Sequence, residues 1–301
     1  MNPITFPGLG LEFHIDRVAF TIFGKDIYWY GIIIACGFLL AVAYCCWQAR
    51  RYGIRQDDLI DMLFFAVPLC IIGARLYYII FYFDLFLTEV DGVLKPDFGK
   101  MVAIWDGGLA IYGGIIMAVI VAAVFCRVRH IKFGALADLG CFGLLIGQAV
   151  GRWGNFVNQE AFGGLTDLPW RMGLTIGGNY VEVHPTFLYE SVWNVIGFFL
   201  LWLIARRWRK FDGQIFLSYI AWYGFGRGII EGLRTDSLYF FGLELFGVPI
   251  RTSQVLGFAS AAVAAGVLLW QLLGRRHRPE DLYVNQAAAQ AARKQEERGA
   301  E

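Results

Sequence analysis

Long apolar runs separated by short polar segments dominate the chain. Three of them, 27–49, 107–126 and 252–274, contain no charged residue and reach the roughly 20 residues needed to cross about 30 Å of hydrocarbon. Four more, 62–83, 133–151, 191–205 and 213–226, are shorter or are interrupted by an ionisable residue. Continuous runs predict helices, because barrel strands would alternate polar and apolar residues. We therefore expect an all-α integral membrane protein, a bundle of about seven transmembrane helices with an outward-facing loop or head region.

Basic residues follow every second apolar run and orient the bundle. They form four clusters: Arg50, Arg51 and Arg55; Arg127, Arg129 and Lys132; Arg206, Arg207, Arg209 and Lys210; and Arg275, Arg276 and Arg278. The connections between them are mixed or acidic. Because cytoplasmic loops carry the excess of Lys and Arg, the N-terminus is expected outside and the C-terminus inside. The expected parts are an outer segment 1–26, a seven-span domain 27–275 with an outer loop at about 151–186, and a cytoplasmic tail 276–301.

Composition supports the membrane assignment and narrows the chemistry. Hydrophobic residues make up 57% of the chain, above the roughly 45–50% of soluble domains. The net charge of +1 gives no indication of a nucleic-acid partner. The six cysteines lie within or at the ends of apolar runs and the four histidines are scattered, so we expect small buried thiols and no metal site.

Ionisable residues gather at the outer ends of the predicted spans. This group consists of Arg75, Arg152, Arg227, Arg234, Glu160, Glu190 and Glu231. A charge at membrane depth normally faces a cavity or a partner, and Arg227, Glu231 and Arg234 are spaced to share one helix face. Arginine binds phosphate through two parallel hydrogen bonds. Either a phospholipid headgroup site or an ion-pair network between helices fits this pattern.

The segment 151–164 carries the most specific signal. It reads Gly151-Arg152-Trp153-Gly154-Asn155-Phe156-Val157-Asn158-Gln159-Glu160-Ala161-Phe162-Gly163-Gly164. Its glycines and asparagines predict a structured outer loop, because Gly permits close backbone approach and Asn satisfies backbone groups. The string resembles the Gly-Arg-x-Gly-Asn-Phe-x-Asn-x-Glu signature of the prolipoprotein diacylglyceryl transferase family.

Five further segments extend the resemblance over about residues 28 to 275. They begin at Trp29, Gly73, Trp105, His184 and Tyr223, and read WYG, GAR, WDGGLAIYGG, HPTFLYE and YGFGRGIIEGLR. The resemblance implies transfer of the diacylglyceryl group of phosphatidylglycerol to the lipobox cysteine thiol of a prolipoprotein. A thioether forms and glycerol-1-phosphate leaves, with no cofactor, in the bacterial cytoplasmic (inner) membrane. The resemblance also implies that 27–275 is the catalytic domain. The implied partners of the protein are phosphatidylglycerol in the membrane and prolipoprotein signal peptides, with no nucleic acid.

The resemblance also suggests roles for individual residues. Arg152 and Arg227 are expected to stabilise the charge of the leaving phosphate. The candidates for orienting or accepting the thiol proton are Tyr30, Tyr112 and Glu160. The expected phosphatidylglycerol-binding residues are Arg152, Asn155, Asn158, Gly163, Arg227, Glu231 and Arg234. Many family members carry His where this chain has Tyr112, and because tyrosine has an ordinary pKa of about 10, we expect Tyr112 to donate a hydrogen bond.

Several residues have a second interpretation. Tyr30 is also compatible with an aromatic anchor at the interface, as the lesser alternative. Glu160 and Glu231 are equally typical of ion-pair partners for Arg152 and Arg227. Glu190 and His184 are expected to organise the loop. For the whole chain, the alternatives are a phospholipid-binding membrane protein or a transporter without transferase activity. No internal repeat supports a transporter.

Overall fold

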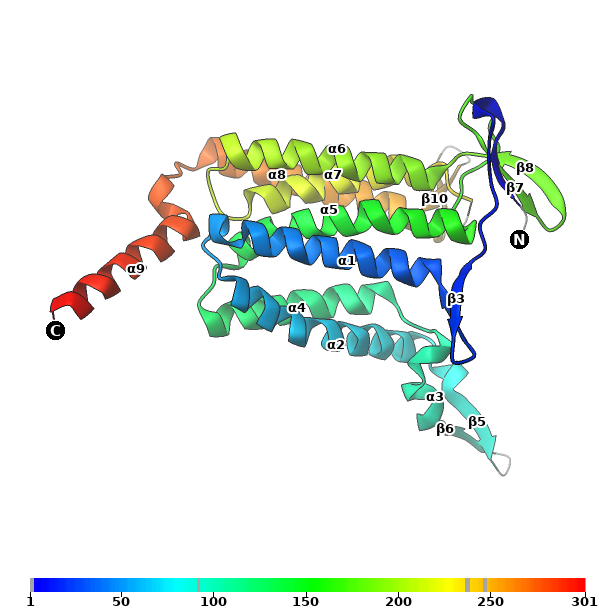
Figure 1. The fold of residues 1–301 in the computed structure, drawn as a ribbon, viewed down its shortest axis with the longest axis horizontal. Helices are drawn as coiled ribbons and strands as arrows, with labels where there is room; N and C mark the ends of the chain where they lie inside the picture. Colours follow the sequence, from blue (N-terminus) through cyan, green and yellow to red (C-terminus); the bar gives the residue numbers. More distant parts are fainter. Residues whose placement is uncertain (1–2, 91–92, 236–238, 246–247, 301) are drawn as a thin grey trace.

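The computed structural model describes residues 3–90, 93–235, 239–245 and 248–300. Within them, long helices lie side by side along one axis (Figure 1). They are α1 (Trp29–Gln48), α2 (Gln56–Phe81), α4 (Ile111–Arg129), α5 (Phe133–Asn158), α6 (Thr186–Arg207), α7 (Gln214–Glu231) and α8 (Thr252–Gly274). Six of these are long and apolar enough to cross a membrane, and α7 falls short by hydropathy because it carries Arg227 and Glu231. The prediction of a membrane bundle of about seven helices is confirmed.

Most predicted spans match a helix, but the expected outer loop at about 151–186 begins too early. Helix α5 continues to Asn158, so the Gly- and Asn-rich stretch up to that residue is helical. Tertiary packing explains the difference, because α1 lies directly against this part of α5. A Cβ on Gly154 would lie 2.6 Å from the Tyr30 ring. The close approach of two helices therefore offsets the cost of glycine within a helix, about 1 kcal/mol.

Small β-sheets at one end of the bundle form the head region. One sheet has the strand order β2-β1-β7-β8, with β1 (Ile4–Phe6), β2 (Leu11–Phe13), β7 (Met172–Ile176) and β8 (Asn179–Val183). The hairpins are β3 (Val18–Ile22) with β4 (Lys25–Tyr28), β5 (Leu87–Val90) with β6 (Val93–Pro96), and β9 (Tyr239–Leu245) with β10 (Val248–Arg251). Thr5 of β1 pairs with Gly173 of β7, so the N-terminal segment is part of the same head as the outer loop (Figure 1).

Short helices and one longer C-terminal helix complete the chain at both ends of the bundle. They are η1 (Pro7–Leu9), η2 (Ala49–Tyr52), η3 (Phe83–Phe86), α3 (Phe98–Val102), η4 (Ile104–Asp106), η5 (Pro279–Asp281) and α9 (Tyr283–Ala300). Helix α9 projects from the end opposite to the head and holds the C-terminal tail (Figure 1). Its first residue, Tyr283, donates its backbone N–H to Asp212 at 2.8 Å, which ties the tail to the bundle.

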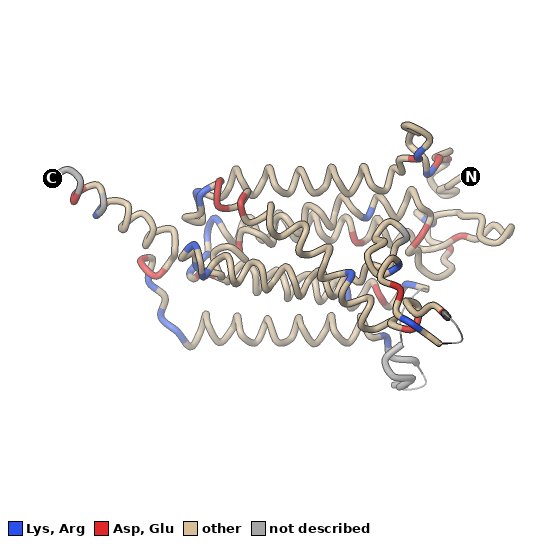
Figure 2. Tube along the Cα trace, turned by 90° about the horizontal axis from the view of Figure 1, so that it is seen from below, with Lys and Arg blue, Asp and Glu red and all other residues tan. Residues whose placement is uncertain are grey.

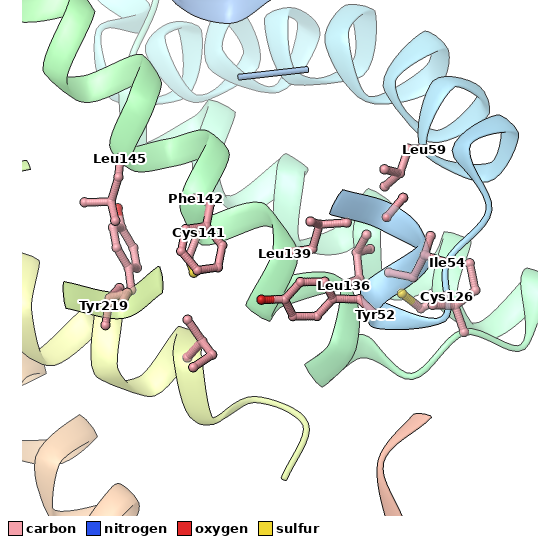
Figure 3. Close-up of a cluster of buried hydrophobic side chains, with 14 residues drawn as sticks. Tyr52, Ile54, Leu59, Cys126, Leu136, Leu139, Cys141, Phe142, Leu145 and Tyr219 are labelled. Carbon is pink, nitrogen blue, oxygen red and sulfur yellow. The ribbon is translucent and has the colours of Figure 1, made fainter. Parts of the chain in front are cut away.

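The largest buried hydrophobic cluster lies near the end that carries α9. Leu139, Leu145 and Ile215 are fully buried in it, and Figure 3 shows its members converging from η2, α2, α4, α5 and α7. Asp138 is also fully buried beside this cluster. Its carboxylate accepts the backbone N–H groups of Gly213 and Phe216, both at 2.9 Å. It therefore caps the first turn of α7, where the backbone N–H groups have no partner within the helix.

Charged residues are concentrated towards the two ends of the bundle, with long uncharged stretches between them (Figure 2). The four basic clusters lie in the last turns of α4 and α6 and directly after α1, α4, α6 and α8, at the end that carries α9. The predicted phosphate-binding arginines lie towards the other end, near the head. This separation matches the two polar boundaries of a bilayer.

Candidate active site

Three arginines converge on a single buried carboxylate at the head end of the bundle. Arg152 comes from the last turns of α5, Arg227 from the last turns of α7, and Arg234 follows α7. All three contact Glu190, which lies in the second turn of α6. We call Arg152, Glu190, Arg227, Glu231 and Arg234 the arginine cluster.

The distances show that Glu190 connects three segments. One of its carboxylate oxygens lies 2.6 Å from Nη2 of Arg152. Its other oxygen accepts from Nη1 of Arg227 at 3.1 Å and from Nη1 of Arg234 at 3.4 Å. The expected pairing of Glu231 with Arg227 is also present, at 2.6 Å within α7. Glu190, which we expected only to organise the loop, is therefore the centre of the cluster.

Burial makes the ion pairs of this cluster electrostatically strong. The side chains of Glu190 and Glu231 are only 5% and 2% exposed, while that of Arg152 is 21% exposed. Three guanidinium groups surround the Glu190 carboxylate, and Arg227 also pairs with Glu231. Buried charges require such pairing, since an unpaired one costs several kcal/mol. The partly exposed arginines can still reach an anion.

A chain of amide hydrogen bonds leads from the arginine cluster to Glu160. Arg152 donates to the Asn155 side-chain oxygen at 3.3 Å, and the Asn155 amide donates to Glu160 at 2.9 Å. The amide of Asn158 also donates to this carboxylate, at 3.4 Å. Arg17 of the head anchors the end of α5 by donating to the Asn158 carbonyl at 2.6 Å. Glu160 is therefore connected to Arg152 through Asn155, and is not its direct ion-pair partner.

Glu160 and Tyr30 line one groove beside this chain. The groove has a volume of about 560 Å³ and is bordered by Arg17, Ile27, Tyr28, Tyr30, Gly31, Asn158 and Glu160. We call it the outer groove. Two of the three candidates for proton transfer, Tyr30 and Glu160, thus share one surface next to the arginine cluster.

Gly163 fixes the position of Arg234. The two residues form an antiparallel β-bridge, and Gly163 separately donates its N–H to the His184 carbonyl at 3.0 Å. A Cβ on Gly163 would lie 2.7 Å from the His184 side chain and 3.0 Å from the Leu233 carbonyl. Glycine is therefore required for the loop to approach the end of α7. The ring of His184 forms a hydrogen bond with the Tyr189 hydroxyl in the first turn of α6, at 3.2 Å.

Tyr112 lies apart from the arginine cluster. It is in the first turn of α4, which packs on α2, and about half of it is exposed. Its ring centroid is 6.5 Å from that of Tyr77. Among the residues that the structure describes, no hydrogen bond joins Tyr112 to the arginines.

Arg75, another arginine near the head end, has a different environment. Its guanidinium donates to five backbone carbonyls, those of Lys100, Met101, Ala103, Gly107 and Gly108, at 2.5–3.1 Å. It also lies 5.1 Å from the centroid of the Phe86 ring. Arg75 therefore holds together the connection between α2 and α4.

In the described part of the chain, no group of three or more His, Cys, Asp or Glu side chains is arranged to hold a metal ion.

Comparison with known proteins identifies the family. A family model described as prolipoprotein diacylglyceryl transferase matches residues 17–270. A phosphatidylglycerol–prolipoprotein diacylglyceryl transferase of Clostridioides difficile strain 630 is 39% identical over 264 residues, 88% of this chain and 98% of the relative. One from Finegoldia magna is 44% identical over 255 residues, 85% of this chain and 94% of the relative. The chain therefore belongs to the prolipoprotein diacylglyceryl transferase family.

Proposed function

We propose that this protein transfers the diacylglyceryl group of phosphatidylglycerol to the lipobox cysteine of a prolipoprotein. The cysteine sulfur forms a bond to the glyceryl carbon, and the bond between that carbon and the phosphate oxygen breaks. The oxygen keeps the electron pair and leaves as glycerol-1-phosphate, while the thiol proton passes to an acceptor. The family match and the names of the relatives support this reaction.

The observation that carries the assignment is the arginine cluster, in which Arg152, Arg227 and Arg234 converge on the buried carboxylate of Glu190. Negative charge grows on the phosphate oxygen as the carbon–oxygen bond breaks, and donors that are already oriented stabilise it best. Glu190 of α6 holds Arg152 and Arg227 in place, and these two arginines come from two different helices, α5 and α7. We assign these two arginines to stabilisation of the leaving phosphate. The other residues that we expect to form the headgroup-binding site are Glu231, Arg234, Asn155, Asn158 and Gly163.

Thiol activation belongs, in our proposal, to the outer groove. The thiolate is the reactive form of cysteine, so a proton acceptor must lie close to the sulfur. Glu160 is exposed, and two amide donors orient its carboxylate. Tyr30 borders the same groove. We assign proton transfer to Glu160 with Tyr30 beside it, and a hydrogen-bond donor role to Tyr112 at the head end of α4.

We further propose the bacterial cytoplasmic membrane as the location, with the N-terminus outside and the C-terminus in the cytoplasm. The basic clusters at the end that carries α9 support this orientation through the positive-inside rule. The arginine cluster then lies at the outer leaflet.

One reaction tests the proposed function directly. Purified protein in detergent is incubated with phosphatidylglycerol and a synthetic lipobox peptide, and the peptide is examined by mass spectrometry. We expect the added mass of one diacylglyceryl group. A peptide with serine in place of the cysteine is the control and stays unmodified. An unchanged mass of the cysteine peptide, with phosphatidylglycerol still bound to the protein, would instead indicate a lipid-binding or transport protein.

A further inference from the structure

A second polar pocket lies at the other end of the bundle, near α9. It has a volume of about 450 Å³ and lies between η2 with the end of α1, α5, and the end of α6. Its lining residues are Tyr44, Gln48, Arg51, Tyr52, Phe142, Trp202, Ala205, Arg206 and Arg209. We call it the basic pocket. It shares no residue with the arginine cluster or with the outer groove.

The basic pocket carries positive charge that the protein does not neutralise. Arg209 is paired with Asp138 at 3.2 Å and with Asp212 at 2.7 Å. In contrast, Arg51 and Arg206 have no carboxylate partner among the described residues, and no acidic side chain lines the pocket. Two uncompensated arginines facing one pocket indicate an anionic ligand.

The orientation of Arg206 and the burial of Gln48 distinguish this pocket from an ordinary basic surface. Arg206 lies over the Trp202 ring, 4.0 Å from its centroid, a cation–π contact that orients the guanidinium. Gln48 is only 4% exposed, yet its side-chain amide has no hydrogen-bond partner in the described part of the chain. The amide is not among the polar atoms of the described residues that are sealed from solvent without a partner, so it opens towards the pocket that Gln48 lines. Its position in the wall of the pocket supplies a donor for a ligand.

Aromatic and apolar side chains form the rest of the wall. Figure 3 shows Tyr52 and Phe142 among the side chains of the buried hydrophobic cluster. Tyr44 packs on Phe142 with a centroid distance of 5.8 Å. The pocket therefore combines charged and polar donors with an apolar wall, at the ends of two membrane-spanning helices where lipid headgroups lie.

We infer that the basic pocket binds the headgroup of an anionic phospholipid in the leaflet at this end of the bundle. Arg51, Arg206 and Gln48 would donate to its phosphate, and the aromatic wall would cover its glycerol and the first part of its acyl chains. This site is separate from the one that we assign to the lipid substrate, and it does not depend on the proposed reaction.

The test counts lipids on the purified protein by native mass spectrometry. The probes are phosphatidic acid and phosphatidylcholine with the same acyl chains, and inorganic phosphate is the competitor. Arg51→Gln/Arg206→Gln removes both uncompensated charges. The matched control is Arg50→Gln/Arg207→Gln, which removes the same charge from exposed neighbours outside the pocket.

We expect the wild type and the control variant to bind one more phosphatidic acid than Arg51→Gln/Arg206→Gln binds. The affinity of Arg51→Gln/Arg206→Gln for phosphatidic acid should be at least about tenfold lower than that of the wild type. Phosphatidylcholine should bind weakly to all three proteins, and inorganic phosphate should not compete. Equal binding by the two double variants would overturn the inference, as would equal binding of phosphatidylcholine. Displacement by inorganic phosphate alone would assign the pocket to a free anion and also overturn it.

A second variant keeps the test decisive if the double variant does not fold. Gln48→Leu retains every arginine and a similar side-chain volume, and it should still weaken phosphatidic acid binding. Unchanged binding would exclude this pocket as the site. Because the basic pocket and the arginine cluster are separate, Gln48→Leu should transfer diacylglyceryl groups to the lipobox peptide as fast as the wild type. Loss of lipid binding here is therefore distinguishable from failure of the proposed function.

Discussion

Replacing Arg152 by lysine tests whether the arginine cluster acts through geometry or only through charge. The two terminal nitrogens of Arg152 have different partners, since Nη1 donates to Asn155 at 3.3 Å and Nη2 contacts Glu190 at 2.6 Å. A lysine ammonium is a single point on a flexible stem and cannot hold both partners in this arrangement. Losing one charge-assisted hydrogen bond costs about 1.5–3 kcal/mol. This corresponds to a rate lower by about ten- to a hundred-fold.

The assay is the transfer reaction with the lipobox peptide, measured as kcat and KM for phosphatidylglycerol. We expect Arg152→Lys to lower kcat, because the oriented donors act on the leaving phosphate. Arg152→Ala should abolish transfer, while its stability loss stays below the roughly 3–5 kcal/mol of a broken buried pair, because Glu190 keeps Arg227 and Arg234.

Arg129→Lys is the matched control for this experiment. Arg129 also contacts two acidic side chains, Asp58 and Asp61, but it lies at the opposite end of α4 from the head. It should retain full transfer activity. Full activity of Arg152→Lys would refute the geometric reasoning, because charge alone would then be sufficient.

Three further outcomes follow from the structure. Gly154→Ala should lower the thermal midpoint of unfolding, because the new Cβ would lie 2.6 Å from the Tyr30 ring and overpacking costs about 1–3 kcal/mol. Gly147→Ala is the control, since its Cβ meets no atom within 4 Å and should leave the midpoint unchanged. Equal effects of the two substitutions would contradict this packing. Tyr112→Phe should transfer about ten- to a hundred-fold more slowly if its hydroxyl donates to a charged headgroup, with an unchanged pH–rate profile; complete loss would indicate a proton acceptor. A reporter fused after Arg207 should read as cytoplasmic, and an external reading would overturn the proposed orientation.

The local pattern of apolar and charged residues was sufficient to predict the helices and the contacts within a single helix. The spacing of Arg227 and Glu231 predicted a pair on one helix face, and the structure contains it at 2.6 Å. The contact of Arg152 with Glu190 joins α5 to α6, and no periodicity within either helix contains that information. The central role of Glu190 therefore required the packing of the helices.

Tertiary contacts also explain where the local signals failed. Glycine and asparagine near residue 154 favour a loop, but the contact with α1 keeps this stretch in α5. Strands β1 and β2 are three residues each, too short for a clear alternation of polar and apolar residues. They exist because β7, far away in the chain, supplies a partner for β1. Such an element cannot be predicted from its own residues.

The same residue type has opposite roles in Arg75 and Arg152, and the partners decide which. A guanidinium has five N–H donors, and five backbone carbonyls accept from Arg75. Backbone carbonyls within a packed connection cannot leave, so a lipid phosphate could bind Arg75 only by unfolding the segment between α2 and α4. Arg152 instead faces a side-chain amide and a carboxylate that two other arginines also neutralise. A phosphate can therefore approach Arg152 without leaving Glu190 unpaired, and this difference favours the arginine cluster, rather than Arg75, as the site of phosphate chemistry.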